Sequence, residues 1–117
     1  MKRVAFLVCS LTLFISLSAC STSDALSLAR QACTYVQSSI NQYNAATKNK
    51  DPKAASVQYA SALLDLRKAE PLASIAAGED TQWQALQATL SESSRVPEKN
   101  LIYSLTQQCQ SAKSGGV

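Results

Sequence analysis

Apolar residues recur at spacings of three and four along most of this 117-residue chain, and this helical periodicity constrains the fold more than any other feature. Alternating β-branched residues, which would predict strands, are nearly absent. Asp51 followed by Pro52 is a strong helix start, because proline lacks the N–H that would be unpaired there. The periodic stretches cover residues 24–47, 51–77, 80–91 and 97–113.

Four amphipathic helices with short links predict an all-α domain over residues 24–113, a small antiparallel four-helix bundle with up-down-up-down order. Ser23 or Asp24 is expected to cap the first helix. Pro71 should end or kink the second helix near Glu70, with Gly78 as a C-terminal cap. The link between the third and fourth helices should point away from the pole where the first helix starts, and residues 114–117 should form a disordered tail.

The first twenty residues have the parts of a secretory signal, namely a basic start, an apolar run over residues 4–15 and a small-residue cleavage site. The sequence Leu17-Ser18-Ala19-Cys20 resembles the lipobox of bacterial lipoproteins. That resemblance implies removal of residues 1–19, a diacylglyceryl group on the Cys20 thiol and an acyl chain on the new amine. Residues 20–23 would then be the lipidated cysteine and a short tether.

Two alternatives to a lipobox remain. An ordinary secretory signal prefers small residues where Leu17 stands. A membrane-spanning anchor needs about 20 apolar residues, more than this run contains. The lipobox resemblance implies a lipid-anchored protein on the outer, extracytoplasmic face of the cell membrane, or alternatively on the periplasmic face of an outer membrane.

The mature part of the chain has a second resemblance. The stretches 66–72, 83–86 and 91–98 look like those of a group of small exported proteins of actinobacteria. This resemblance implies an envelope with a single membrane and assigns no activity.

Two cysteines, Cys33 and Cys109, remain when the signal and Cys20 are set aside. In an exported protein such a pair is most simply a disulfide, although free thiols or an intermolecular bridge are alternatives. Cys33 lies early in the first predicted helix and Cys109 late in the fourth, so the predicted bundle places both in the same half.

The composition argues against several functions. Residues 20–117 hold nine basic and eight acidic side chains without a Lys/Arg cluster along the sequence, which disfavours nucleic-acid binding. The chain has no histidine, which removes the usual general base and the commonest zinc ligand. We expect no enzymatic activity, no metal and no cofactor other than the covalent lipid.

The candidate binding residues lie in the mixed-charge stretch 91–98, where Glu92, Arg95 and Glu98 could contact a partner. A helix stop, a link and a capped helix start explain the same residues. Glu79 and Asp80 are interpreted as helix caps rather than a metal site, and Trp83 as a core residue rather than a partner anchor.

The expected function is that of a non-enzymatic envelope lipoprotein that binds the membrane through Cys20 and binds or scaffolds another envelope protein. The alternative is a small-ligand or lipid carrier with a pocket between the helices lined by Tyr and Leu.

Overall fold

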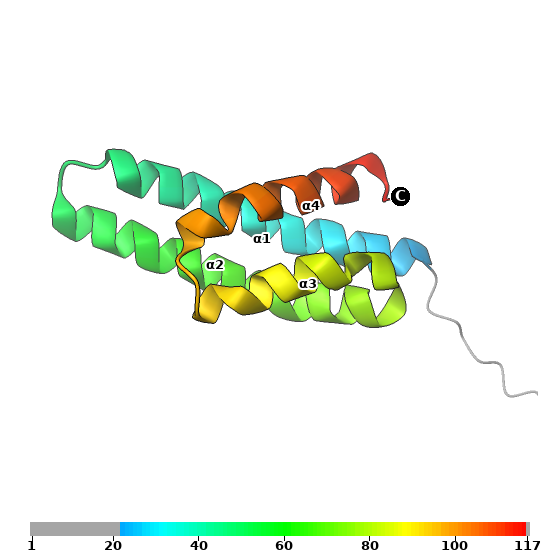
Figure 1. Cartoon of the computed structure of the whole chain (residues 1–117). Coiled ribbons are helices and arrows are strands. Elements are labelled where there is room, and N and C mark those ends of the chain that lie inside the picture. Colours follow the sequence, from blue (N-terminus) through cyan, green and yellow to red (C-terminus); the bar gives the residue numbers. More distant parts are fainter. Residues whose placement is uncertain (1–21, 117) are drawn as a thin grey trace, which may run out of the picture.

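The computed structural model describes residues 22–116, and these form an antiparallel four-helix bundle without a strand (Figure 1). The predicted all-α class is confirmed. The signal, Cys20 and Ser21 lie outside the described residues. The helices are α1 (Thr22–Lys48), α2 (Pro52–Glu79), α3 (Gln84–Ser91) and α4 (Ile102–Ser114). Single 3₁₀ turns lie at Thr81–Trp83, Glu92–Ser94 and Glu98–Asn100.

The turn between α1 and α2 is built as the sequence predicts. The Asp51 carboxylate accepts a hydrogen bond from the backbone N–H of Lys53 at 3.0 Å, and Pro52 is the first residue of α2. Asn49 closes the turn, because its side-chain oxygen accepts from the N–H of Asp51 and its amide donates to Gln58. The predicted start of the second helix is confirmed.

Pro71 was predicted to end or kink the second helix near Glu70, and it does not end it, because α2 continues through Pro71 to Glu79. A proline inside a helix removes one N–H and crowds the preceding turn. Here Ala69, Ala73 and Ala76 on both sides of it are fully buried, so tertiary packing holds the helix together. Gly78 lies inside the helix and is not its cap. Instead the extended residue Asp80 ends α2, with its N–H donating to the carbonyl of Ala76 at 2.8 Å.

The beginning of α1 also differs from the prediction. Ser23 and Asp24 were expected as N-caps, but both lie within the helix, which includes Thr22. Asp24 in the first turn still suits the positive end of the helix dipole.

The core has two kinds of packing. Small side chains form the seam between α1 and α2, which allows the two backbones to approach closely. Its fully buried members are Ala25, Ala29, Ala32, Ala62, Ala69, Ala73 and Ala76. Larger side chains fill the space where α3 and α4 cover the hairpin. They include Val36, Leu66, Trp83, Leu86, Leu90 and Leu105.

The two helical hairpins differ in length. The 27 residues of α1 span roughly 40 Å at 1.5 Å per residue, whereas the 13 residues of α4 span roughly 20 Å. The α1–α2 hairpin therefore extends beyond the link between α3 and α4 (Figure 1). We call this uncovered part, residues 40–61, the arm. The α3–α4 link was expected at the outward pole, but it lies partway along the hairpin, and the free end is the turn at residues 49–51.

Helix α4 ends one residue later than predicted and closes with a left-handed residue. Gly115 has φ 101°, a conformation that glycine adopts without strain, and the N–H of Gly116 donates to the carbonyl of Ser111 at 2.8 Å.

Candidate functional site

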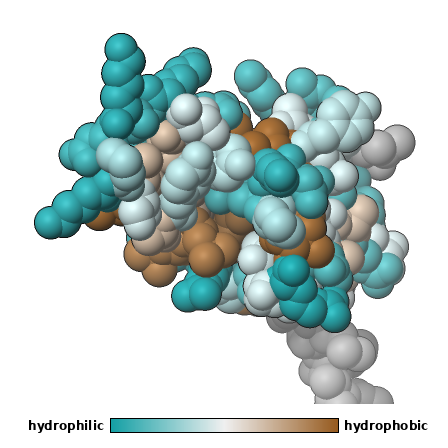
Figure 2. Space-filling view, turned by 60° about the vertical axis from the view of Figure 1, so that its left-hand side comes forward, coloured by the Kyte–Doolittle hydropathy of each residue, from teal (hydrophilic) through white to brown (hydrophobic). Residues whose placement is uncertain are grey.

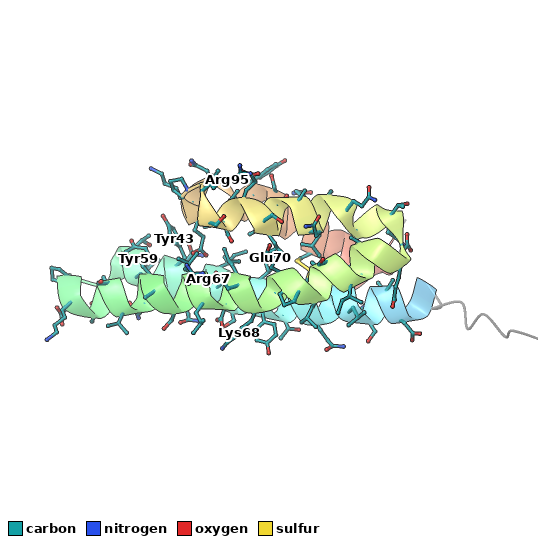
Figure 3. The ribbon with its side chains drawn as sticks, turned by 90° about the horizontal axis from the view of Figure 1, so that it is seen from below. Tyr43, Tyr59, Arg67, Lys68, Glu70 and Arg95 are labelled. Carbon is teal, nitrogen blue, oxygen red and sulfur yellow. A yellow bond between two sulfur atoms is a disulfide. The ribbon has the colours of Figure 1, made fainter. Side chains whose placement is uncertain are left out.

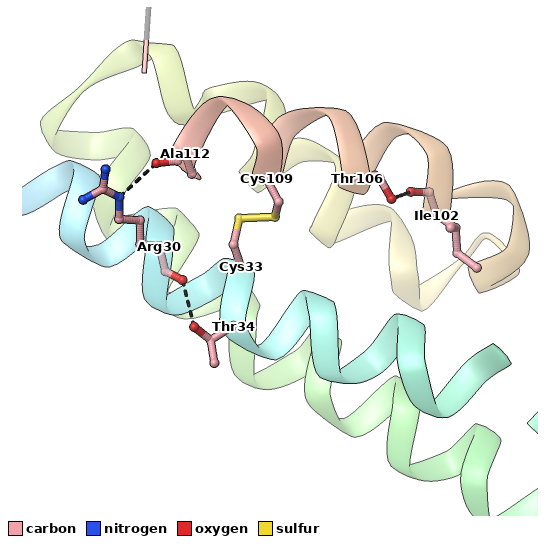
Figure 4. The surroundings of a disulfide bond; sticks show 7 residues. All are labelled: Arg30, Cys33, Thr34, Ile102, Thr106, Cys109 and Ala112. Atoms are coloured by element: carbon pink, nitrogen blue, oxygen red, sulfur yellow. Dashed lines mark hydrogen bonds between the residues drawn. A yellow bond between two sulfur atoms is a disulfide. The ribbon is translucent and has the colours of Figure 1, made fainter. Parts of the chain in front are cut away.

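A disulfide joins α1 to α4, as predicted. Cys33 and Cys109 are bonded with their Cα atoms 5.4 Å apart. One turn along α1, the guanidinium of Arg30 donates to the carbonyl of Ala112 at 2.9 Å (Figure 4). The same carbonyl, in the last turn of α4, otherwise accepts, among residues 22–116, only the long 3.4 Å hydrogen bond from the N–H of Gly115. A covalent bond and a charged hydrogen bond thus fix the two helices together.

A surface groove of about 870 Å³ lies beside this disulfide, between α1 and α4. Its apolar lining includes Val36, Ile40 and the disulfide, and its polar lining includes Gln37 and Gln110. Neither Tyr nor Leu lines it. The carrier hypothesis predicted a pocket lined by Tyr and Leu between the helices, and this groove does not have that lining.

A second feature is the corner where the arm meets the α3–α4 link. Tyr43 of α1 and Tyr59 of α2 lie there on the side of the hairpin that carries α3 and α4 (Figure 3). Their ring centroids are 5.2 Å apart with an interplanar angle of 63°, an edge-to-face arrangement. Leu63 and Arg67 follow Tyr59 at intervals of four and so share its face of α2. We call this corner the step.

Glu98 forms the wall of the step next to Tyr43. Its carboxyl oxygen lies 2.6 Å from the hydroxyl of Ser39, which is fully buried and also donates to the carbonyl of Ala62 at 2.7 Å. Burial raises the pKa of Glu98 and the nearby Asp65 carboxylate raises it further, whereas the Ser39 hydrogen bond lowers it. Through Ser39, Glu98 therefore connects the α3–α4 link to both α1 and α2.

Tyr43 is affected by the same surroundings. Burial, then the neighbouring Tyr59 and Glu98, raise the pKa of its phenol above the ordinary value. A tyrosine with an ordinary pKa of about 10 is already protonated at neutral pH. Tyr43 therefore keeps an O–H that can donate a hydrogen bond.

Asp65 organises the opposite face of the hairpin. It accepts hydrogen bonds from Ser38 at 2.7 Å and from Gln42 at 2.6 Å, and Lys68 lies 3.7 Å from its second oxygen. Lys68 also lies 5.9 Å from the centre of the Tyr35 ring. These contacts join α1 and α2 where α3 and α4 do not cover them.

The structure does not bring the three predicted binding residues together as one surface. Glu92 and Arg95 form an ion pair at 2.5 Å. Glu98 turns inward to Ser39 instead. Tyr43, Tyr59 and Arg67 were not singled out as candidates. The unequal lengths of the predicted helices were the signal for them, because helices of 24 and 27 residues cannot be covered along their whole length by helices of 12 and 17 residues.

The remaining sequence candidates have structural roles. Asp80 caps the turn that follows it by accepting from the N–H of Gln82 at 3.1 Å. Trp83 is 2 % exposed and belongs to the core. Glu79 ends α2, and one of its oxygens is buried without a hydrogen-bond partner among residues 22–116. No group of three or more potential metal-ligating side chains lies together in this part of the chain.

Basic side chains are concentrated at the arm end of the molecule. Residues 40–68 and 92–100 hold seven basic and four acidic side chains, whereas the rest of residues 22–116 hold two basic and four acidic ones. The four carboxylates at the arm end are all engaged: Asp51 as a cap, Asp65 and Glu98 with serines, and Glu92 with Arg95. Within the described chain, five basic side chains of this end have no ion pair: Lys48, Lys50, Lys53, Arg67 and Lys99.

No protein-family model, curated protein or solved structure matches the chain. None of the helices in residues 22–116 combines the length and the apolar character needed to span a membrane.

Proposed function

We propose that this chain is an envelope lipoprotein, anchored by lipid at Cys20, whose helical domain is a non-enzymatic module that binds or scaffolds another envelope protein. The observation that carries the proposal is the combination of the Leu17-Ser18-Ala19-Cys20 sequence with a domain closed by one disulfide. Disulfides of this kind persist in oxidising compartments outside the cytosol, where a lipobox would send the chain.

The proposed anchor has a direct test in Cys20→Ala. The variant should lose incorporation of a labelled fatty acid, keep its signal segment and leave the detergent-soluble membrane fraction. Cys9→Ala is the matched control, because Cys9 lies within the predicted signal and should not affect acylation. A Cys20→Ala chain that still incorporates the fatty acid would refute the anchor.

The interaction role is supported by where the polar chemistry of the domain lies. The chain has no histidine, and the carboxylates of the arm end are used in caps, ion pairs and hydrogen bonds. The molecule also presents an uncovered arm on which Tyr59 is exposed beside the half-buried Tyr43. Such surfaces are typical of sites that bind other proteins.

The carrier alternative draws its support from the groove between α1 and α4 alone. Four leucines fill the core at less than 2 % exposure, so the large side chains pack against one another rather than around an enclosed cavity: Leu66, Leu86, Leu90 and Leu105. We therefore place the interaction role first. The carrier function would come first if a small molecule co-purified with the chain and was lost when substitutions widened or blocked the groove.

A further inference from the structure

The arm end combines an apolar floor with an excess of positive charge. Tyr59 is 38 % exposed, and Val57 and Leu64, which share another face of α2, are 63 % and 51 % exposed. Figure 2, which looks toward the free end of the hairpin, shows hydrophobic surface with hydrophilic side chains around it. Monomeric proteins expose large apolar side chains singly, and a group of them surrounded by polar residues marks an interaction site.

The step is the part of this end that has a defined shape. Tyr43 and Tyr59 form its floor (Figure 3), and Leu63 continues the same face of α2 one turn after Tyr59. The wall is the α3–α4 link, where Glu98 contacts Ser39 of α1. The Glu98–Ser39 contact holds the wall against the hairpin, so the corner is rigid where the link meets α1. The arm beyond it, from Ile40 to Lys48 on α1, is roughly 12 Å long, which matches two turns of a helix or about four extended residues.

The charge around the step determines what it can bind. Arg67 shares the α2 face of Tyr59, it is exposed, and it has no ion pair within residues 22–116. Lys48, Lys50 and Lys53 surround the free end of the arm. A carboxylate entering the step would meet a guanidinium able to bind it through two hydrogen bonds and a tyrosine O–H able to donate a third.

We infer that the step is a docking site for an acidic, apolar-containing peptide segment of a partner protein, with Tyr43, Tyr59 and Leu63 as the apolar floor and Arg67 as the carboxylate-binding residue. This inference rests on the proposed interaction role and adds its location and the chemistry of the partner. Aromatic and arginine side chains supply most of the binding energy in protein interfaces. The step has both kinds, a pair of tyrosines and an arginine without an ion pair among residues 22–116. A purely ionic surface would not need the tyrosine floor.

The test is a selection of random peptides on the full-length chain, purified after expression with its own N-terminal segment. Enriched peptides should combine Asp or Glu with Leu, Phe or Trp. Their affinity should fall at least about tenfold in Tyr59→Ser and in Arg67→Glu, as for central aromatic and arginine residues of an interface. Binding should also weaken as salt rises, because the exposed charges are screened.

Matched variants separate the step from the rest of the surface. Tyr103→Ser removes an exposed tyrosine of α4, 76 % exposed, and Lys113→Glu makes the same charge change at the other end of the molecule. Both should bind the peptides as the unmodified chain does. Arg67→Glu also distinguishes lost binding from misfolding. Because Arg67 is exposed and has no ion pair among residues 22–116, the variant should keep the helix content and unfolding temperature of the unmodified chain.

Each other outcome overturns the inference in a different way. Enriched peptides that bind the Tyr59 and Arg67 variants normally would keep the interaction role and remove the step from it. Enrichment of no peptide would remove both. Binding of polyphosphate that depends on Arg67 and not on Tyr59 would indicate an anionic polymer. A concentration-dependent dimer lost in Tyr59→Ser would indicate a second copy of the chain.

Discussion

Ser39 has one hydroxyl proton and two acceptor oxygens within reach, the carbonyl of Ala62 at 2.7 Å and the carboxyl of Glu98 at 2.6 Å. The hydroxyl donates to both of these oxygens, so Ser39 links the Glu98 carboxyl to the backbone of α2. Burial is the largest cause of the raised pKa of Glu98, whereas the hydrogen bond from Ser39 favours the carboxylate and lowers the pKa. The net effect is a carboxyl group that holds its proton more readily in the folded chain than in the unfolded chain.

This arrangement predicts a specific pH dependence. Because the pKa of Glu98 is higher in the folded than in the unfolded chain, its contribution to stability is complete below the ordinary glutamate pKa and is lost as the pH rises through the folded value. Glu98→Gln places an uncharged side chain of the same length beside Ser39 at every pH. The free energy of unfolding of this variant, relative to the unmodified chain, should therefore increase with pH, measured by urea denaturation between about pH 4 and 8.

Glu92→Gln is the control for this measurement, because Glu92 is partly exposed and pairs with Arg95 without contacting Ser39. Equal pH dependence of the two variants would contradict the role of Glu98 in this pH dependence.

The surroundings of Glu98 also explain why its role was not predicted from the sequence. Its position in a polar link predicted a solvent-facing charge, and nothing in the sequence places the buried Ser39, 59 residues away, beside it.

At the scale of the helices, the alanine seam sets how closely α1 and α2 approach. Ala69 is fully buried in that seam, and Ala60 on the same helix is exposed. Ala69→Leu must force additional methylenes between two close backbones, which should destabilise the fold by about 1–3 kcal/mol. Ala60→Leu should change the free energy of unfolding by less than about 0.5 kcal/mol. Thermal or urea unfolding of both variants provides the measurement, and equal effects would show that the seam tolerates larger residues.

The helices could be predicted to different degrees. The start of α2 was predictable, because Asp51 and Pro52 act through local backbone chemistry. Its end was not, since the local effect of Pro71 is outweighed by packing of the buried alanines around it, and packing partners come from distant parts of the chain. The step was missed for the same reason. Tyr43 and Tyr59 are ordinary stripe residues along the sequence and become a corner only where α3 and α4 stop.

At the scale of the whole molecule, the disulfide closes a loop of 76 residues and joins the first helix to the last. In the chain-entropy account, such a closure stabilises the fold by about 4 kcal/mol. The double variant Cys33→Ser, Cys109→Ser should lose an amount of this order in urea denaturation. Reduction of the unmodified chain with a phosphine should cause the same loss, and reduction should leave the double variant unchanged. A loss well below 1 kcal/mol in both would show that helix packing alone determines stability.

The up-down-up-down order and the pairing of Cys33 with Cys109 were both predictable because each depends on chain order and helix count. The position of the link along the hairpin depends on relative helix lengths and on where the contacts of Glu98 fall, which the sequence does not report. The fold was therefore predictable as a class, and the uncovered arm was not predicted.

The bond between Cys33 and Cys109 has one more consequence, which concerns proteolysis. The turn at residues 49–51 is the free end of the hairpin and contains Lys50, an exposed residue that trypsin-like proteases recognise. A single cut there, or at any peptide bond between the two cysteines, leaves both pieces joined through sulfur. The nicked molecule keeps every residue of its bundle in one covalent unit. Under the proposed anchor at Cys20, the first piece would hold the second at the membrane until the disulfide is reduced.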